Sequence, residues 1–433
     1  MLEMKDSRIP WIGKIPQNWK TPSLKYITDD ITDFTASGSF ADLAKNVKYL
    51  DSEDYAMLIR AADLSAKRKI SHIYINKHAY DYLKKSNLYG GELILPNIGS
   101  VGTIYRYTPL YKRSTLAPNS IMIKSINNHF LYYLFDNGAG ENALKGLSNA
   151  TTQSKFNKTQ LRNLKVILPP KGEQKAITDF LDSKCADIDS LTGDIQKQIE
   201  ILKEYKKSII TRAVTKGLDP NVEMKDSGIE WIGRIPKTWN ILPLYMLFSE
   251  RKNRNSRGKE TNLLSLSYGR IIRKNINTNI GLLPESFNTY NIVEKNDIII
   301  RPTDLQNDKK SLRTGLVKEH GIITSAYIAL MPLRNINSIY FHYLLHAYDV
   351  AKVFYNMGNG VRQGLNYSEF CKLLVVCPNR LEQQAIVDSL DTKCADIDAA
   401  IEGKQKQLDV LKEYKKSLIY EYVTGKKEVP CCE

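Results

Sequence analysis

Cysteine is scarce in this chain of 433 residues, which contains six cysteines and no CxxC pair. This usage argues against a disulfide framework and against a zinc site, and it is typical of reduced thiols. Cys185 and Cys394 occupy matching places in an internal repeat, where a small buried side chain is the simplest role. Cys431 and Cys432 end the chain, and we expect them in an exposed tail.

Long hydrophobic runs are also missing. No stretch of about eighteen apolar residues occurs, and the opening MLEMKDSRIPWIG has no apolar segment of secretory length. We therefore expect a cytoplasmic protein with no membrane partner. Hydrophobic residues at 42% and charged residues at 25% are ordinary for a globular protein, and the length suits two to three domains.

The motifs that usually carry catalysis are absent. No GxxxxGK[ST] loop is found, which argues against a nucleotide-driven motor. His342 and His346 lie four residues apart, but Tyr343 stands where a zinc protease has glutamate, so core or surface histidines are the better interpretation. No Asp-Pro-Pro-Tyr or Asn-Pro-Pro-Tyr segment, which positions an amine for methylation, occurs. We expect no catalytic residue, metal ligand or cofactor in this chain, so any catalysis must come from a partner.

Positive charge is plentiful and unevenly distributed, with a net charge of +15. Residues 1–172 contain 24 Lys and Arg against 14 Asp and Glu, and residues 224–381 contain 22 against 12, an excess of +10 in each segment. Residues 173–223, with 8 against 10, and residues 382–433, with 8 against 11, are slightly acidic. If the partner is a polyanion, the two basic segments hold it.

Two long stretches repeat each other. EQKAITDFLDSKCADID begins at residue 173 and EQQAIVDSLDTKCADID at residue 382, and both continue to an LKEYKKS motif. Apolar side chains at heptad spacing predict two long helices that pair with each other, although each helix could instead serve only its own domain's core. Lys404 interrupts the second seam. The seam we predict comprises Ile188, Leu191, Ile195, Leu202, Tyr205 and Ile209, and Ile397, Leu408, Leu411, Tyr414 and Leu418.

A shorter repeat precedes each half of the chain. Residues 4–19, MKDSRIPWIGKIPQNW, recur as MKDSGIEWIGRIPKTW at 224–239, with 11 of 16 positions identical. We call these the lead-in segments. Their prolines and glycines indicate extended chain pinned to a surface. Trp11 and Trp231 could stack on bases, but anchoring each segment to its own domain is the better interpretation because the segments carry few charges.

The middles of the two halves differ in length and sequence but keep a common order of parts. GELILP at 91–96 matches NDIIIRP at 296–302 as a strand, SIMIK at 120–124 matches SAYIAL at 325–330, and helices are expected from 130 and 341. NKTQL at 157–161 and NYSEF at 366–370 predict short capped helices, and KVILPP at 165–170 and LVVCP at 374–378 predict strands. The fold class is therefore α+β, with two small mixed α/β domains. The boundaries we expect are 1–172 for the first domain, 173–216 for the first long helix, 217–239 for a linker with the second lead-in segment, 240–381 for the second domain, 382–425 for the second long helix and 426–433 for a tail.

The loops between these parts are polar and differ most between the halves. They intersperse Arg, Lys, Asn and Gln, whose side chains contact phosphates and base edges, although any single loop could be only a solvated face. Asn97, Gln153, Arg301, Arg313, Arg362 and Gln363 are the candidates for base reading. The full set of candidate DNA-binding residues is Asn97, Ser100, Arg106, Lys112, Arg113, Thr152, Gln153, Lys155, Arg254, Arg257, Arg301, Thr303, Lys309, Lys310, Arg313, Arg362 and Gln363.

The two lead-in segments, each followed by a variable domain and an EQ-x-AI…LKEYKKS helix, closely resemble the DNA-specificity subunit of type I restriction-modification systems. The resemblance implies two target-recognition domains, an antiparallel coiled coil of the two long helices, and an internal pseudo-twofold repeat. It also implies double-stranded DNA, two methyltransferase subunits and two restriction subunits as partners. Those subunits would bind S-adenosylmethionine for adenine methylation and ATP with magnesium, while this chain would be a non-catalytic specificity subunit.

Helix length sets an expectation for the target. Residues 188–216 would span about 42 Å as a helix at 1.5 Å per residue, close to the ~34 Å repeat of DNA half-sites. We expect two short, different sequences separated by unread base pairs. The alternatives are an RNA-binding or structural protein with duplicated basic domains, which competition between duplex DNA and single-stranded RNA would separate, and an enzyme in its own right, which lacks a catalytic constellation.

Overall fold

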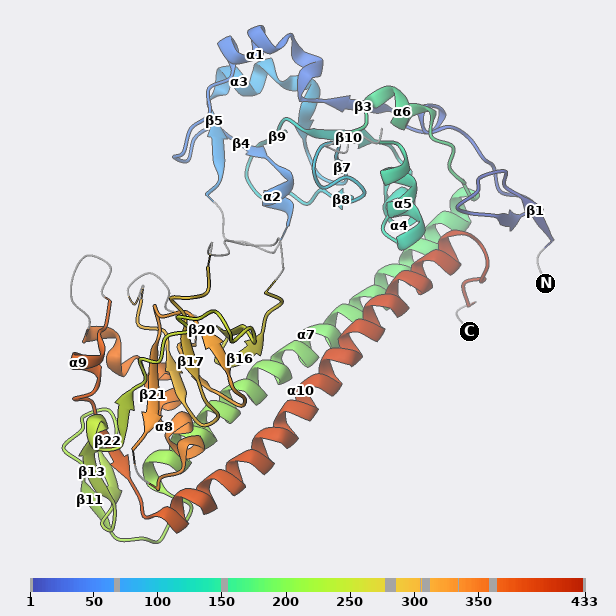
Figure 1. The fold of residues 1–433 in the computed structure, drawn as a ribbon. Helices are drawn as coiled ribbons and strands as arrows, with labels where there is room; N and C mark the ends of the chain where they lie inside the picture. Colours follow the sequence, from blue (N-terminus) through green and yellow to red (C-terminus); the bar gives the residue numbers. More distant parts are fainter. Residues whose placement is uncertain are drawn as a thin grey trace. The chain divides into compact units, whose positions relative to one another are not determined.

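A computed structural model describes residues 3–65, 71–148, 155–276, 286–303, 305, 312–333, 335–357 and 364–430. The chain divides into two compact units, one formed by Met1–Ile195 with Lys406–Glu433 and the other by Gln196–Gln405. Each unit therefore contains one globular domain together with half of each long helix, α7 (Lys171–Lys216) and α10 (Arg380–Val423) (Figure 1).

The first unit combines small antiparallel sheets with short helices. One four-stranded sheet has the order β3-β10-β7-β8, and a second has the order β5-β4-β9-β6, in which only β4 and β9 run parallel. Its elements are β1 (Met4–Asp6), β2 (Lys14–Pro16), β3 (Asp30–Asp33), α1 (Phe40–Asn46), β4 (Ala56–Ile59), α2 (Ala61–Leu64), β5 (Ile73–Ile75), α3 (Lys77–Tyr82), β6 (Asn87–Leu88), β7 (Leu93–Pro96), β8 (Tyr105–Arg106), β9 (Ser114–Leu116), β10 (Ser120–Lys124), α4 (Asn128–Phe135), α5 (Gly138–Gly146) and α6 (Lys158–Asn163).

The second unit repeats the first sheet with the equivalent order β14-β21-β18-β19, and adds the pairs β13-β22, β15-β16 and β17-β20. Its elements are β11 (Met224–Asp226), β12 (Arg234–Pro236), β13 (Asn240–Pro243), β14 (Phe248–Glu250), β15 (Leu264–Ser267), β16 (Arg270–Arg273), β17 (Asn291–Val293), β18 (Ile298–Ile300), β19 (Thr314–Leu316), β20 (Gly321–Ile323), β21 (Ile328–Pro332), α8 (Ser338–Val350), α9 (Tyr367–Phe370) and β22 (Leu374–Cys377).

The α+β fold class and the shared order of parts are confirmed. β7 and β18, β10 and β21, α4 and α8, and α6 and α9 fall on the matched sequence pairs. Asn157 and Asn366 cap α6 and α9, each accepting a backbone hydrogen bond from the residue three positions later. One prediction is wrong in the first half: residues 165–168 form only isolated bridges with Ser23 and Lys20, whereas their counterpart β22 pairs with β13 along four residues.

Each lead-in segment folds as a small hairpin against its own unit. β1 pairs with β2 and β11 with β12 in the same register. The second tryptophan of each segment is buried, and its indole N–H donates to the glutamate of the EQ motif, from Trp19 to Glu173 at 2.6 Å and from Trp239 to Glu382 at 2.8 Å. The repeated EQ motif thus ties the lead-in hairpin to the start of the long helix.

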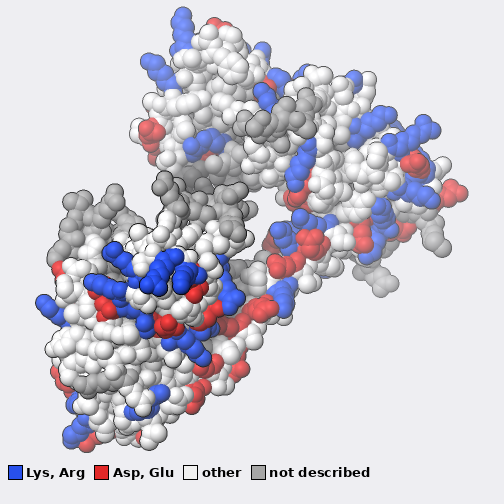
Figure 2. All heavy atoms as spheres, viewed as in Figure 1, with Lys and Arg blue, Asp and Glu red and all other residues white. Residues whose placement is uncertain are grey.

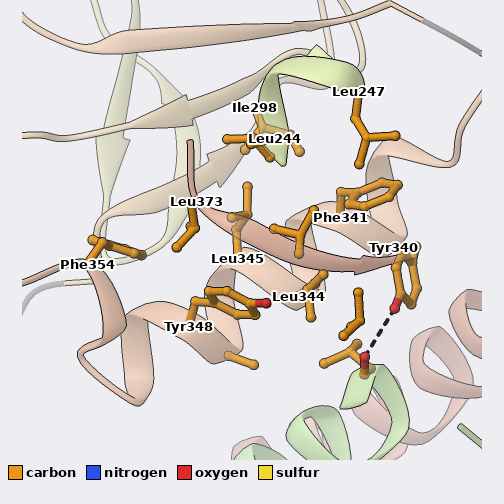
Figure 3. Close-up of a cluster of buried hydrophobic side chains, with 14 of the residues drawn as sticks. Leu244, Leu247, Ile298, Tyr340, Phe341, Leu344, Leu345, Tyr348, Phe354 and Leu373 are labelled. Carbon is orange, nitrogen blue, oxygen red and sulfur yellow. Dashed lines mark hydrogen bonds between the residues drawn. The ribbon is translucent and has the colours of Figure 1, made fainter. Parts of the chain in front are cut away.

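Within each unit the halves of α7 and α10 pack antiparallel. In the first unit Phe180 contacts Tyr422 and Asp189 pairs with Lys415, while in the second unit Lys206 pairs with Asp398. The two ion pairs join the same two motifs, LKEYKKS and ADID, in opposite directions. The helices also enter the cores of their units, since Tyr340 on α8 donates to the carbonyl of Val214 on α7 (Figure 3). Pairing and core packing, which we treated as alternatives, are both present.

The seam between the helices consists of two rows of side chains. One row lies at the predicted positions and the other does not. Ile188, Ile195, Leu202 and Ile209 lie on it, but the second row follows at four residues, not three. Leu191, Tyr205 and Tyr414 are 48%, 56% and 55% exposed, so these three seam predictions are wrong. The second row consists of Cys185, Thr192, Ile199, Lys206 and Ala213 on α7, and the corresponding positions on α10 are Cys394, Ile401, Leu408, Lys415 and Tyr422.

Polar seam residues explain the error. Lys206 and Lys415 sit on the seam with their amines on Asp398 and Asp189, and Lys404 donates to Gln198. Lysine can occupy a seam when its stem packs and its amine finds an acceptor.

Among the described residues no helix is both long and apolar enough to span a membrane.

Candidate nucleic-acid interface

One group of predicted residues in the first unit meets at the end of β7. Ile98 bridges to Lys155, and Phe156 N–H donates to the carbonyl of Asn97 at 3.2 Å. Asn97 Nδ2 donates back to the Phe156 carbonyl at 3.1 Å, so its amide holds two loops together. Ser100 and Lys155 are exposed beside this junction. The predicted residues Thr152 and Gln153 lie outside the described part of the chain.

The other predicted residues of the first unit lie elsewhere. Arg106 on β8 pairs in register with Leu93, at the start of β7, and lies in a shallow hollow with Gly90, Gly91 and Tyr132. Lys112 and Arg113 are exposed just before β9 in the second sheet.

Arg113 is already oriented by an aromatic side chain. Its guanidinium lies 4.4 Å from the ring centroid of Tyr55, a ring that also contacts Tyr80. Stacking of this kind preorients a guanidinium while leaving its N–H groups available for phosphate or base oxygens.

Arg60, which sequence reasoning did not single out, is a basic residue at the other end of the β4–β9 pair from Arg113. It follows β4 directly, and its guanidinium is held by Asp63, which is also contacted by His72. Burial works against ionisation of Asp63, but its hydrogen bonds with Arg60 and His72 prevail, so its pKa is lowered. A basic side chain after a buried strand was the available signal.

In the second unit the loop after β14 presents Arg254 and Arg257 as exposed side chains. The loop is internally fixed: buried Asn255 accepts from the N–H of Glu260 and donates to its carbonyl. Gly258 has a φ of +61°, and the position of an added Cβ would lie 2.9 Å from Asn288 Oδ1. Arg254 also bridges to Asn291 at the start of β17. These two predicted arginines therefore extend from an ordered loop.

His320 fastens this loop to the β17–β20 layer. Its Nε2 lies 2.8 Å from Glu260 Oε2 and its Nδ1 lies 2.9 Å from Glu294 Oε1. Carboxylates only accept hydrogen bonds, so both ring nitrogens donate only when the imidazole is protonated. The hydrogen bond to Glu294, followed by its charge and that of Glu260, raises the pKa of His320 against the opposing effect of burial.

The prediction that Arg313 reads bases is wrong, because the residue is buried. Its side chain is 0% exposed, and its guanidinium donates to Tyr355 Oη at 2.9 Å and to the carbonyl of Thr303 at 2.5 Å. The neighbouring carboxyl of Asp349 accepts from the Arg313 backbone and from Tyr355. A side chain without accessible surface cannot contact DNA, so Arg313 is removed from the candidates and belongs to the core.

Two predicted residues adjoin this core network. Arg301 follows β18, and its backbone N–H donates to the Arg313 carbonyl at 2.8 Å. Thr303 is exposed two residues later. Lys309, Lys310, Arg362 and Gln363 lie outside the described residues.

The first tryptophan of each lead-in segment anchors the segment. Trp11 stacks on Phe135 with ring centroids 6.4 Å apart, and Trp231 meets Tyr348 edge-on at 4.4 Å. Both lie against the hydrophobic cores of their own units. The structure therefore supports anchoring over base stacking.

His342 and His346 on α8 are partly buried, in line with their interpretation as core or surface histidines. Burial lowers the pKa of His342 to about 3 and that of His346 to about 4. Within the described residues, no cluster of three or more His, Cys, Asp and Glu side chains is arranged to hold a metal ion. The basic loops and sheet edges are thus the chemically distinctive surfaces of both units.

Comparison with known proteins shows which family the chain resembles. Residues 24–201 match the model of the type I restriction modification DNA specificity domain. The chain is 27% identical over 430 residues to a putative type I restriction enzyme MjaX specificity subunit of Methanocaldococcus jannaschii, covering 96% of this chain and 95% of the relative. It is 24% identical over 351 residues to the MjaVIII specificity subunit of the same organism, covering 77% of this chain and 78% of that relative.

The fold agrees with a solved structure. A chain from a study of complex assembly and conformational transition of the type I R-M system has a TM-score of 0.61 to this chain at 12% identity, covering 95% of this chain and 99% of its own length. The matched family model and the names of these relatives agree with the predicted role in sequence-specific DNA recognition and do not favour the RNA-binding alternative. Over nearly its whole length the chain is thus similar to type I restriction enzyme specificity subunits.

Proposed function

We propose that this chain reads an asymmetric, bipartite site in double-stranded DNA, one half with each unit. The observation that carries the proposal is that both units contain the same four-stranded sheet but present different exposed residues around it. β3-β10-β7-β8 and β14-β21-β18-β19 repeat the same sheet, whereas the exposed basic residues around them differ in element and position. Different reading surfaces on equivalent frames bind different base sequences, so the site should not be palindromic.

The proposal assigns affinity to the exposed cations and specificity to neighbouring polar groups. Arg113, Lys155, Arg254 and Arg257 would neutralise phosphates and make binding depend steeply on salt. Reading the host chromosome would require the protein to work in the cytoplasm.

Two equivalent apolar patches support docking of two methyltransferase subunits. Ile201 and Tyr205 are exposed one turn apart on α7, and Val410 and Tyr414 are exposed at the repeat-equivalent positions of α10. One patch falls in each unit. Large exposed apolar side chains at matching positions are typical of interaction sites. In this proposal the methyltransferase subunits bind S-adenosylmethionine for adenine-N6 methylation, and two restriction subunits bind ATP and magnesium.

Stoichiometry tests the docking sites. We expect Tyr205→Ala and Tyr414→Ala each to reduce the methyltransferase bound per specificity subunit from two copies to one, and the double variant to bind none. Native mass spectrometry of the purified complex would measure this. Lys203→Ala and Lys412→Ala, which change exposed helix positions at the same repeat offset, should leave two copies bound.

Methylome sequencing tests the reading function. Hosts with and without this gene, in the presence of the methyltransferase gene, should differ by one methylated motif consisting of two unlike parts separated by unspecified bases. A palindromic motif, or an unchanged methylome, would contradict the proposal.

A further inference from the structure

The β15–β16 hairpin of the second unit has no counterpart in the sequence predictions. Its strands pair from Leu264 with Arg273 to Ser267 with Arg270, which leaves Tyr268 and Gly269 as a two-residue turn. Both turn residues have positive φ, 46° and 77°, as in a type I′ turn. The hairpin is therefore a regular, tightly closed ribbon.

The ribbon has an inner and an outer face. Leu264, Leu266 and Ile271 lie on the inner face because cross-strand partners share a face. Gly315 of β19 allows the close approach, since a Cβ there would lie 2.6 Å from Leu266 Cδ1 and 2.9 Å from Ile271 Cδ1. Arg273, on the same side, forms an ion pair with Glu319. The inner face thus fixes the ribbon to its unit.

The outer face consists of Ser265, Ser267, Arg270 and Ile272, and Lys274 continues it. Arg270, Ile272 and Lys274 are exposed. Arg273 and Glu319 neutralise each other, but Arg270 and Lys274 form no ion pair with any residue that the structure describes. Figure 2 shows Lys and Arg gathered over the region where Figure 1 labels β16. The outer face therefore combines small hydroxyls with uncompensated positive charge.

Tyr268 at the tip is hard to explain by folding alone. It is 84% exposed, and its φ of 46° is a conformation that aromatic residues rarely adopt. Type I′ turns favour Asn-Gly or Asp-Gly, so tyrosine makes this turn less stable than the usual residues would. Strained residues that contribute nothing to packing are characteristic of functional sites.

We propose that the β15–β16 hairpin is a groove-reading ribbon of the second unit, with its outer face against a DNA groove and Tyr268 in contact with bases. The major groove admits a two-stranded ribbon, and serine hydroxyls, arginine and an aromatic ring can all contact base edges there. Arg270 and Lys274 contact the flanking phosphates. This inference rests on the proposed function and assigns one of its reading elements.

The experiment separates binding from folding with Tyr268→Asn. Asparagine suits positive φ in a type I′ turn, so this variant should melt at the same temperature as the wild type or higher. Tyr245→Asn is the matched control, because Tyr245 is also an exposed tyrosine of this unit, at 53%, but lies outside the hairpin. Fluorescence anisotropy would measure the Kd of the full chain for a duplex carrying the motif found by methylome sequencing and for a scrambled duplex.

We expect Tyr268→Asn to raise Kd for the motif duplex about tenfold or more and for the scrambled duplex less than about twofold, because a base contact is lost. Arg270→Ala should weaken binding to both duplexes and reduce the salt dependence by about one phosphate contact. In the host, Tyr268→Asn should relax one part of the methylated motif and leave the other unchanged.

The possible failures are distinguishable. If the wild type discriminates between the duplexes and Tyr268→Asn binds and methylates as the wild type does, the hairpin is not a reader although the proposed function stands. If Tyr268→Asn weakens both duplexes equally, Tyr268 is not a base contact. If the wild type itself does not discriminate, the proposed function fails.

Discussion

At the scale of single residues, Arg313 shows that the character of a side chain does not reveal its environment. Its loop is polar and basic in sequence, yet the guanidinium is enclosed by Tyr355 and the Thr303 carbonyl. Arg257 has the same chemical character, but its side chain is exposed. Burial depends on long-range packing, which a single loop sequence does not encode.

Arg313→Met should destabilise the second unit by about 2–4 kcal/mol, because Tyr355 Oη and the Thr303 carbonyl lose their donor in a buried site and Asp349 loses a neighbouring positive charge. Chemical denaturation followed by tryptophan fluorescence would measure the change. Arg257→Met is the matched control, and it should leave stability within about 0.5 kcal/mol while weakening DNA binding. Equal stability of the two variants would contradict the assignment of Arg313 to the core.

His342 and His346, both partly buried, predict an acid sensitivity of the second unit. Both have folded-state pKa values of about 3 and 4, below the unfolded value of about 6.5, because burial disfavours the charged ring. Between these values the unfolded chain binds more protons, so stability must fall as the pH falls from about 6.5 towards 4. Lys318 near His342, and Lys206 and Lys207 near His346, add to this effect.

Melting temperatures measured from pH 7 down to pH 4.5 would test this sensitivity. His342→Leu should give a flatter curve than the wild type, whatever its absolute stability. His72→Leu, which removes an exposed histidine of the first unit, is the control and should retain the slope attributed to His342. A wild-type curve parallel to that of His342→Leu would show that burial of His342 does not govern this range.

At the scale of elements, regular patterns were predictable and individual deviations were not. Ile188, Ile195, Leu202 and Ile209 locate α7's seam because a row of like residues every seven positions leaves little choice. The second row escaped prediction because Thr192 and Lys206 are polar, whereas the apolar Leu191 and Tyr205 face outward. The β15–β16 hairpin was missed because Tyr-Gly is not an ordinary hairpin turn.

The ion pairs across the seam predict a charge-exchange result. Lys206 Nζ lies 2.7 Å from both carboxylate oxygens of Asp398. Lys206→Asp or Asp398→Lys alone places like charges together and should reduce unfolding free energy by about 1 kcal/mol, and the double exchange should recover most of this loss. Thermal unfolding of the three variants would measure it, and additive losses in the double variant would exclude direct pairing.

At the scale of the whole molecule, the two units differ in the number of chain segments that form them. Gln196–Gln405 forms one unit by itself, whereas the other unit needs the start and the end of the chain. The last turns of α10 contribute Leu418, Ile419, Tyr422 and Val423 to the first unit's hydrophobic core. The repeat in the sequence revealed two halves, but the point at which each long helix passes from one unit to the other depends on contacts that the sequence does not show.

Deleting residues 406–433 should unfold the first unit and spare the second. Each of the four buried apolar side chains contributes about 1.5–3 kcal/mol, and together they rival the total stability of a domain. Limited proteolysis with mass spectrometry should then digest residues before 195 and protect a fragment near 196–405. Deleting only 426–433, beyond α10, should leave both units resistant; a protected first unit in the longer deletion would refute the shared core.

The contact between the first lead-in segment and the end of α10 sets an order of maturation. Tyr420 Oη contacts the carbonyls of Trp11 and Ile12, and Gly425 leaves room for Pro16 and Trp19. During translation the first unit therefore cannot complete its fold until α10 has been synthesised, whereas all residues of the second unit are synthesised before residue 406. The nascent N-terminal half stays incomplete through nearly the whole of translation, and it is the half that chaperones should engage longest.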